Sequence, residues 1–174
     1  YLKYNYSKSF VLAGRFNINT PFITPQDGRM RPTLEQGIWA GIREWDKVGF
    51  NGGWIHAVSP RSTMTWYETG ESIGIYATGV NEQGIKSGYS GNVASEGMAI
   101  ANVFYKPFDR WKINIWDAWV ENVFNTVMIE IYTERTDTRH NIDIYHGFIF
   151  MHQDALNNGG NEDPAKAYIR KGSQ

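Results

Sequence analysis

A short run at residues 70–74 carries the pattern of a serine-hydrolase nucleophile. Gly70, Ser72 and Gly74 match the G-x-S-x-G motif, in which a sharp turn from a strand into a helix exposes the serine hydroxyl above a parallel sheet. The residues that follow Ser72 alternate in polarity as far as Val80, which predicts a strand instead of a helix. The motif therefore lacks the context that its chemistry needs, and we do not expect Ser72 to be a nucleophile.

Three histidines in the last third of the chain suggest a metal site at first sight. His140, His146 and His152 are six residues apart on a segment that alternates like a strand. Six residues of strand span about 20 Å, whereas a bound ion holds each ligand at about 2 Å. The three side chains cannot share one ion, so we expect no metal and no cofactor. We expect the histidines to form hydrogen bonds at a core edge or an interface.

Paired carboxylates are a third possible chemistry, because two acids about 5–10 Å apart can hydrolyse a glycosidic bond. The candidate acids and the tryptophans that could stack on a sugar are Glu68, Glu130, Glu134, Trp39, Trp54 and Trp66. Solvated acids on strand faces explain these carboxylates more simply. We expect no catalytic residue and no enzyme, and a hydrolase that uses a glutamate pair is kept as an alternative.

Composition limits the class of protein. The 174 residues suffice for one domain, the net charge is −1, and cysteine is absent. No run of eighteen apolar residues occurs, so no transmembrane helix is expected. Aromatic residues make up 15% of the chain, enough to fill a thick core, build a subunit interface or line a stacking surface for sugars or bases.

Alternating polarity predicts mostly strands. Residues 9–19, 123–132 and 142–152 each read as a strand, and residues 47–58 as a bulged strand or a hairpin. Residues 33–45 begin with a possible capping box and continue with apolar residues at helical spacing, which predicts a short helix. The expected core is Phe10, Leu12, Phe16, Ile18, Val48, Trp54, Ile129, Ile131, Ile144, Phe148 and Phe150.

These elements favour an all-β fold, a single antiparallel jelly-roll or Greek-key β-sandwich with one short helix. Residues 1–152 would form the jelly-roll domain and residues 153–174 a polar C-terminal tail. The glycine-rich residues 81–97 would form a long loop, and such loops in compact domains are usually functional or interfacial.

Three segments follow one another in a recognisable order: an aromatic and basic run at residues 39–48 that continues to Pro60, a Pro-Phe-x-Arg-aromatic element at 106–111, and an aromatic strand around 144–148. This order resembles the capsid proteins of small circular single-stranded DNA viruses, the circovirus-like group. The likeness covers most of residues 9–152 in order and residue type. A rigid sandwich with long loops, many aromatic residues and no catalytic constellation agrees with a shell protein.

The resemblance implies a structural capsid protein that self-assembles into an icosahedral shell around a genome, which would be single-stranded DNA. It places the protein in the virion, and in the host cell during assembly, with no membrane partner. Its implied inner-face, nucleic-acid-binding residues are Lys3, Lys8 and Arg15. Its implied subunit-interface residues are Lys106, Phe108, Arg110 and Trp111. A carbohydrate-binding β-sandwich module with exposed aromatic platforms is the first alternative.

Overall fold

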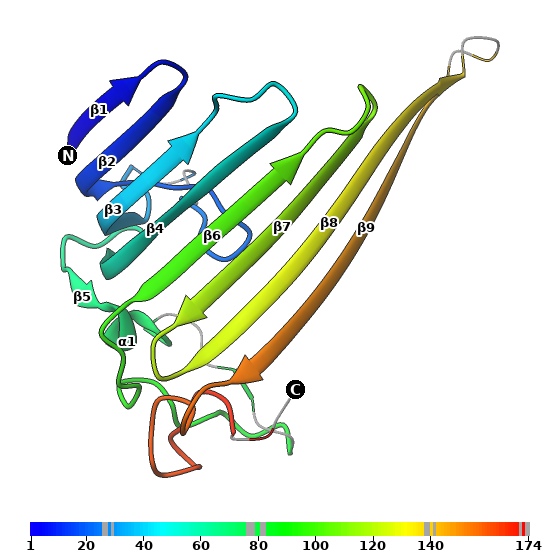
Figure 1. The fold of residues 1–174 in the computed structure, drawn as a ribbon. Helices are drawn as coiled ribbons and strands as arrows, with labels where there is room; N and C mark the ends of the chain where they lie inside the picture. Colours follow the sequence, from blue (N-terminus) through cyan, green and yellow to red (C-terminus); the bar gives the residue numbers. More distant parts are fainter. Residues whose placement is uncertain are drawn as a thin grey trace.

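The part of the chain that the structure describes folds into one antiparallel β-sheet of nine strands with one short helix (Figure 1). This computed structural model describes residues 1–25, 28, 30–75, 79–80, 83–137, 140, 142–170 and 172. The elements are β1 (Leu2–Tyr6), β2 (Ser9–Phe16), β3 (Leu34–Ile42), β4 (Val48–Ser59), β5 (Tyr67–Glu68), α1 (Thr69–Ser72), β6 (Met98–Tyr105), β7 (Trp111–Val120), β8 (Phe124–Asp137) and β9 (Ile142–Ala155).

The strands follow one another across the sheet in the order β1-β2-β3-β4-β6-β7-β8-β9, with β5 paired to the end of β4. The predicted all-β, antiparallel class with one short helix is confirmed. The predicted jelly-roll sandwich is wrong, because every strand in the described part of the chain belongs to this single sheet. Successive long strands pair with their neighbours through the chain, so none crosses to a second layer.

The helix predicted at residues 33–45 is instead strand β3. Leu34, Ile38 and Ile42 are four residues apart, and a spacing of four also places side chains on one face of a strand. Gly37 and Gly41 lie on the opposite face, where a Cβ would come within 2.0 Å of the Trp54 carbonyl oxygen and within 2.5 Å of the Phe10 ring, respectively. The two glycines that weaken a helix are what lets the neighbouring strands approach.

The helix that does form, α1, occupies the segment with the hydrolase-like motif. The backbone N–H of Glu68 donates to Oε2 of Glu71 at 3.3 Å, and the two side chains form a capping box at the helix start. The strand predicted over residues 72–80 therefore begins inside a helix, and its residues 76–78 lie outside the described residues. The strands predicted at 9–19, 123–132 and 142–152 are confirmed as β2, β8 and β9. Strand β4 runs without a break through Asn51, Gly52 and Gly53.

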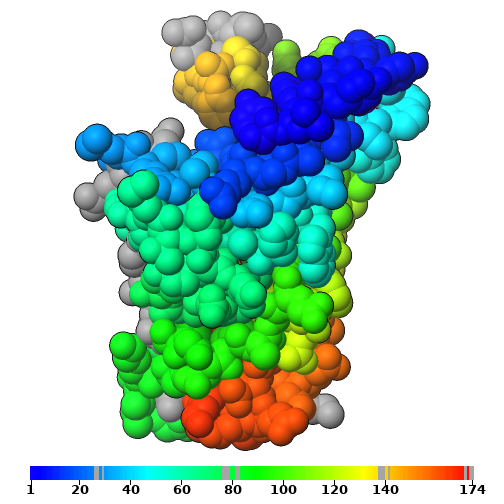
Figure 2. Space-filling view, turned by 90° about the vertical axis from the view of Figure 1, so that its left-hand side faces the viewer, coloured from blue at the N-terminus to red at the C-terminus, as the bar shows by residue number. Residues whose placement is uncertain are grey.

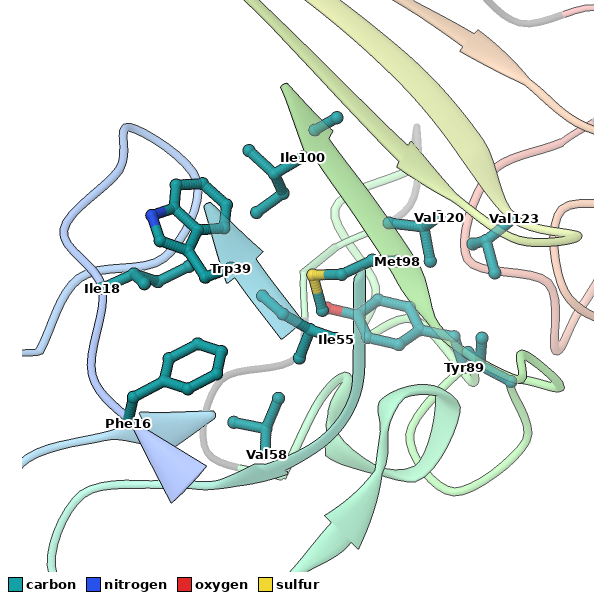
Figure 3. Packing of buried hydrophobic residues seen from close by; sticks show 12 residues of the cluster. Phe16, Ile18, Trp39, Ile55, Val58, Tyr89, Met98, Ile100, Val120 and Val123 are labelled. Carbon is teal, nitrogen blue, oxygen red and sulfur yellow. The ribbon is translucent and has the colours of Figure 1, made fainter. Parts of the chain in front are cut away.

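Two long connections, residues 17–33 and 60–97, pack against one face of the sheet and form the buried core with it (Figure 3). We call this the inward face and its opposite the outward face. Phe16 and Ile18 are buried as predicted. Trp54, Ile144, Phe148 and Phe150 are not core residues: they lie on the outward face with 37%, 39%, 61% and 51% of their surface exposed. The prediction placed them in the core because it assumed that the apolar face is the buried one.

The residues after β9 pack against the 60–97 connection, as the orange and green surfaces of Figure 2 show. The N–H of Ala94 donates to the Gly160 carbonyl at 2.8 Å. The Tyr168 ring lies 5.0 Å from that of Tyr89 and 5.3 Å from that of Phe124. The expected division at residue 152 falls inside β9, and the segment after it has tertiary contacts of its own.

Candidate functional site

The outward face carries an unbroken apolar row. The row follows the strand register across six neighbouring strands, one residue from each. Its members are Ile42, Phe50, Val103, Ile115, Ile129 and Phe150. These aliphatic and aromatic side chains are half-exposed or exposed, and no described element covers them. An exposed hydrophobic surface of this kind marks contact with lipid or another protein.

Aromatic residues lie at both ends of this apolar surface. At the end next to the long connections, the rings of Trp54 and Trp119 lie 6.1 Å apart. Toward the other end, Trp45 packs edge-on against Phe50 at 5.9 Å. Asp117 also lies on the outward face, next in the alternation to Trp119, and its carboxylate accepts a hydrogen bond from the Asn125 amide at 2.8 Å. Aromatic girdles on either side of an apolar band are typical of strands that cross a membrane.

The inward face is polar where the two long connections leave it uncovered. Arg43 donates to the side-chain oxygen of Asn51 and to the Phe50 carbonyl at 2.9 Å. The Asn51 amide donates to Asn102 at 3.0 Å, and the Arg43 guanidinium lies 4.6 Å from the centre of the Phe104 ring. We call Arg43, Asn51 and Asn102 the polar row. Asn51 and Asn102 are opposite each other in the register and adjoin Phe50 and Val103 of the apolar row, and Arg43 directly follows Ile42, the last residue of β3.

Glu130 continues the polar surface on β8. Its carboxylate accepts three hydrogen bonds, from Asn114 Nδ2 at 3.1 Å, Trp116 Nε1 at 3.0 Å and the Tyr132 hydroxyl at 2.8 Å. Because these donors come from two neighbouring strands, Glu130 fixes the side chains of this part of the inward face. The inward face is therefore charged and hydrogen-bonded at Glu130, whereas the outward face of the same strands is apolar.

A recess of about 320 Å³ opens between the polar row and the beginning of the 17–33 connection. Arg43, Asn51 and the two asparagines at 17 and 19 supply its polar groups. Its apolar lining residues are Phe10, Leu12, Ile18, Trp39 and Trp116. An apolar, partly aromatic recess with a few convergent polar groups is the usual form of a small-molecule site.

A buried carboxylate holds the 17–33 connection to the inward face of the sheet. Glu35 has no exposed surface, and its Oε2 accepts the N–H of Ile18 at 3.0 Å. Its Oε1 is buried without a hydrogen-bond partner among the described residues. Thr20 closes the next turn, with its hydroxyl accepting the N–H of Ile23 at 2.9 Å. The connection therefore lies along the inward face and does not project from the edge of the sheet.

The three residues expected to face a genome have different surroundings. Lys3 lies over the Phe10 ring at 5.6 Å on the inward side. Lys8 is in the β1–β2 turn, 3.5 Å from Asp46. In that turn region the Ser9 hydroxyl donates to Glu44 at 2.6 Å, which is the main reason why the pKa of Glu44 is lowered from its ordinary value. Arg15 is on the outward face. Nucleic-acid binding by these residues stays an untested prediction.

The four expected interface residues lie together at the β6–β7 connection. Lys106, Arg110 and Trp111 line an open recess of about 500 Å³ that also includes Lys112, Tyr132 and Tyr145. Phe108 is exposed in the same connection. The structure brings these residues together, and their role in a subunit contact stays a prediction.

The candidate catalytic groups are dispersed. The Ser72 hydroxyl donates to the Thr69 carbonyl at 2.8 Å inside α1. Glu130 and Glu134 are four residues apart on one strand, a separation of about 13 Å and too long for a glycosidase pair. His152 pairs with Asp154 at 3.0 Å. In the described ranges no group of three His, Cys, Asp or Glu side chains could hold a metal ion, and no helix is long and apolar enough to cross a membrane.

Comparison with known proteins identifies the family of the chain. The family model for outer membrane porins of the OprD family matches residues 1–161. The chain belongs to this family. A comparison with curated proteins finds no match.

Solved porin structures share the fold. Pseudomonas aeruginosa OccD3 (OpdP) has a TM-score of 0.71 at 20% identity, over 90% of this chain and 35% of that one. The outer membrane protein OpdK of Pseudomonas aeruginosa has a TM-score of 0.74 at 16% identity, over 97% of this chain and 39% of that one. A BenF-like porin from Pseudomonas fluorescens Pf-5 has a TM-score of 0.72 at 17% identity, over 91% of this chain and 37% of that one. The chain thus spans little more than a third of the length of these porins.

Membership in the OprD family corrects the functional predictions. The capsid resemblance is wrong, and with it the icosahedral shell, the viral genome as a partner, the virion as location and the absence of a membrane partner. The carbohydrate-binding and hydrolase alternatives find no support either. The order of strands and aromatic residues is not specific to capsid proteins. Strands that face lipid on one side and strands that face a protein core on one side share the same alternation of apolar and polar side chains.

Proposed function

We propose that this chain forms about a third of the wall of a β-barrel channel that lets small solutes cross a bacterial outer membrane. The observation that carries the proposal is the pair of adjacent rows, apolar on the outward face and Arg43-Asn51-Asn102 on the inward face. Strands of porins alternate between a lipid-facing apolar side and a polar side toward the lumen. The role is passage of solutes and involves no catalysis.

In this proposal the remaining two thirds of the barrel pair with the edges at β1 and β9. An open sheet leaves unpaired N–H and C=O groups at both edges, and the interior of a membrane tolerates such groups only when further strands close the barrel. Porins have short turns on the periplasmic side and longer loops outside the cell. The ends that carry the 17–33 and 60–97 connections would then be extracellular, with the 17–33 connection and the part of the 60–97 connection that follows β5 folded into the channel entrance.

The recess beside Arg43 favours a small aromatic acid as one of the solutes. One related porin structure contains vanillate, an aromatic carboxylate. The guanidinium of Arg43 offers a positive charge near the aromatic rings of Phe10, Trp39 and Trp116, a combination that suits a planar anion. Arg43→Gln should then weaken block of the channel by vanillate.

The direct test is conductance of the whole porin in a planar lipid bilayer. We expect discrete current steps, and a shift of ion preference toward anions in Glu130→Gln, because a carboxylate leaves the inward wall. Glu44→Gln is the control, since it removes a charge from the exposed β3–β4 connection outside the wall. A folded protein that inserts into the bilayer and passes no current would refute the proposal.

A further inference from the structure

We propose that Arg15 and Trp66 form a binding site for the phosphate of a lipid in the outer leaflet of the membrane. The inference rests on the proposed function, because it needs the outward face to be in contact with lipid. It adds a specific lipid contact to a face whose central band is apolar.

The first observation is the position of Arg15. It pairs with Gln36 in the register, one step beyond the pair Ala13 and Ile38 on the same face. Ile38 is an exposed apolar residue of the outward face, whereas Arg15 and Gln36 are polar. Arg15 therefore lies where the apolar band ends on the side of the long connections, the level at which lipid headgroups meet the protein.

The second observation is that the guanidinium is already oriented. It stacks over the Trp66 ring with its centre 4.5 Å from the ring centroid, and its Nε donates to Gln36 Oε1 at 3.3 Å. Stacking and one hydrogen bond restrict a side chain that otherwise loses much rotamer freedom when it binds. A fixed guanidinium therefore has a smaller entropic cost when it takes up a ligand.

The third observation is the donors that remain. Within the described part of the chain, the two terminal amino groups of Arg15 have no hydrogen-bond or ion-pair partner. Two parallel N–H groups of a guanidinium match two oxygens of a phosphate, and such pairs are among the stronger hydrogen bonds of proteins. Basic side chains next to an anionic membrane surface bind lipid headgroups for the same reason. A tryptophan at this level adds contact with the adjoining lipid.

Stacking on Trp66 alone would have a second consequence, the attachment of residues 60–66 to β2. A lipid-binding role and an attachment role make different predictions for a lysine at position 15. Lysine keeps the charge and loses the two-pronged geometry, so it should bind phosphate weakly. If attachment were the whole role, lipid binding would not respond to either substitution.

The test uses the whole porin in detergent, with bound lipid counted by native mass spectrometry. The probes are lipid A, the phosphorylated glycolipid of the outer leaflet, phosphatidylglycerol, and inorganic phosphate. The variants are Arg15→Gln and Arg15→Lys, and Arg110→Gln is the matched control because it lies in the short β6–β7 connection at the opposite end of the strands. Circular dichroism and bilayer conductance confirm that each variant is folded and inserted.

We expect Arg15→Gln to bind lipid A about 10- to 100-fold more weakly than the parent, the effect of losing hydrogen bonds to a charged group. Arg15→Lys should be intermediate, Arg110→Gln unchanged, and inorganic phosphate at millimolar concentration should not displace lipid A.

Equal lipid A binding by the parent and Arg15→Gln would overturn the inference. So would an equal loss in Arg110→Gln, equally strong binding of phosphatidylglycerol, or displacement by inorganic phosphate, which would indicate a site for the free ion. Because conductance is measured on the same samples, a channel that conducts normally without this lipid contact would refute only the lipid site. A parent protein without conductance would refute the channel itself.

Discussion

Ile129 of β8 and Phe150 of β9 lie directly opposite each other in the strand register, and both side chains are on the outward face. The preceding residue of β9, Ile149, lies opposite Glu130 on the inward face. Two adjacent residues of one strand thus have opposite surroundings, apolar for one and polar for the other. This alternation is the basis of the proposed channel wall, and a single pair of substitutions can test it.

Phe150→Arg should destabilise the membrane-inserted porin by about 2–4 kcal/mol, the cost of a basic side chain facing lipid at mid-membrane depth. Ile149→Arg should change the stability little, because it adds a charge on the inward face opposite Glu130. The measurement is the free energy of unfolding from lipid vesicles in urea. Equal effects of the two variants would contradict the assignment of the faces.

The buried Glu35 should hold the 17–33 connection through the N–H of Ile18. Glu35→Leu leaves that N–H without an acceptor and should cost about 1–3 kcal/mol. Glu35→Gln keeps an oxygen that can accept and should cost clearly less. Limited proteolysis within residues 17–33, together with urea unfolding, measures the effect; faster cleavage of the glutamine variant than of the leucine variant would be inconsistent with this anchor.

Tyr168 should make the attachment of the C-terminal segment sensitive to alkaline pH. Burial raises the pKa of Tyr168 above its ordinary value, and the charge of Tyr89 adds to the effect. A tyrosine with a raised folded-state pKa contributes stability that is complete below its ordinary pKa of about 10 and is lost as the pH rises through the folded-state value.

Proteolysis of residues 156–170 should therefore accelerate above about pH 10 in the parent porin. Tyr168→Phe should be protected at that pH, because it keeps the contacts with Tyr89 and Phe124 and cannot ionise. Tyr168→Ala should be cleaved faster at every pH. Parallel pH profiles for the parent and the phenylalanine variant would show that the ionisation of Tyr168 has no such effect.

The sequence predicted the strands better than their surroundings. A period of two in residues 142–152 defines which side chains share a face, and β9 follows it. The same period does not tell whether the apolar face meets a protein core or lipid, so Phe148 and Phe150 were placed inside. Strand β3 was missed because Leu34, Ile38 and Ile42 satisfy the helical and the strand spacing equally.

The polar row of the inward face was also missed. The bulged strand or hairpin predicted at residues 47–58 gives Asn51 no role, and no pattern in the sequence singles out Asn102 or Asn114. The signal that could have found them is a polar residue at the centre of each of several strands of about ten residues, on the face opposite the apolar side chains. Hydrogen bonds across strands, such as Asn51 to Asn102, need the register, which sequence alone did not supply.

The most direct test of the two-faced wall is the reactivity of single cysteines, because this stretch of the protein contains none. Phe148→Cys places a thiol on the outward face, and Ile149→Cys places one on the inward face. Each whole porin, inserted in lipid vesicles, is treated with a water-soluble, membrane-impermeant maleimide. We predict labelling of Ile149→Cys, no labelling of Phe148→Cys until the protein is denatured, and the same labelling of both afterwards. Equal labelling in the membrane, or labelling of Phe148→Cys alone, would contradict the account.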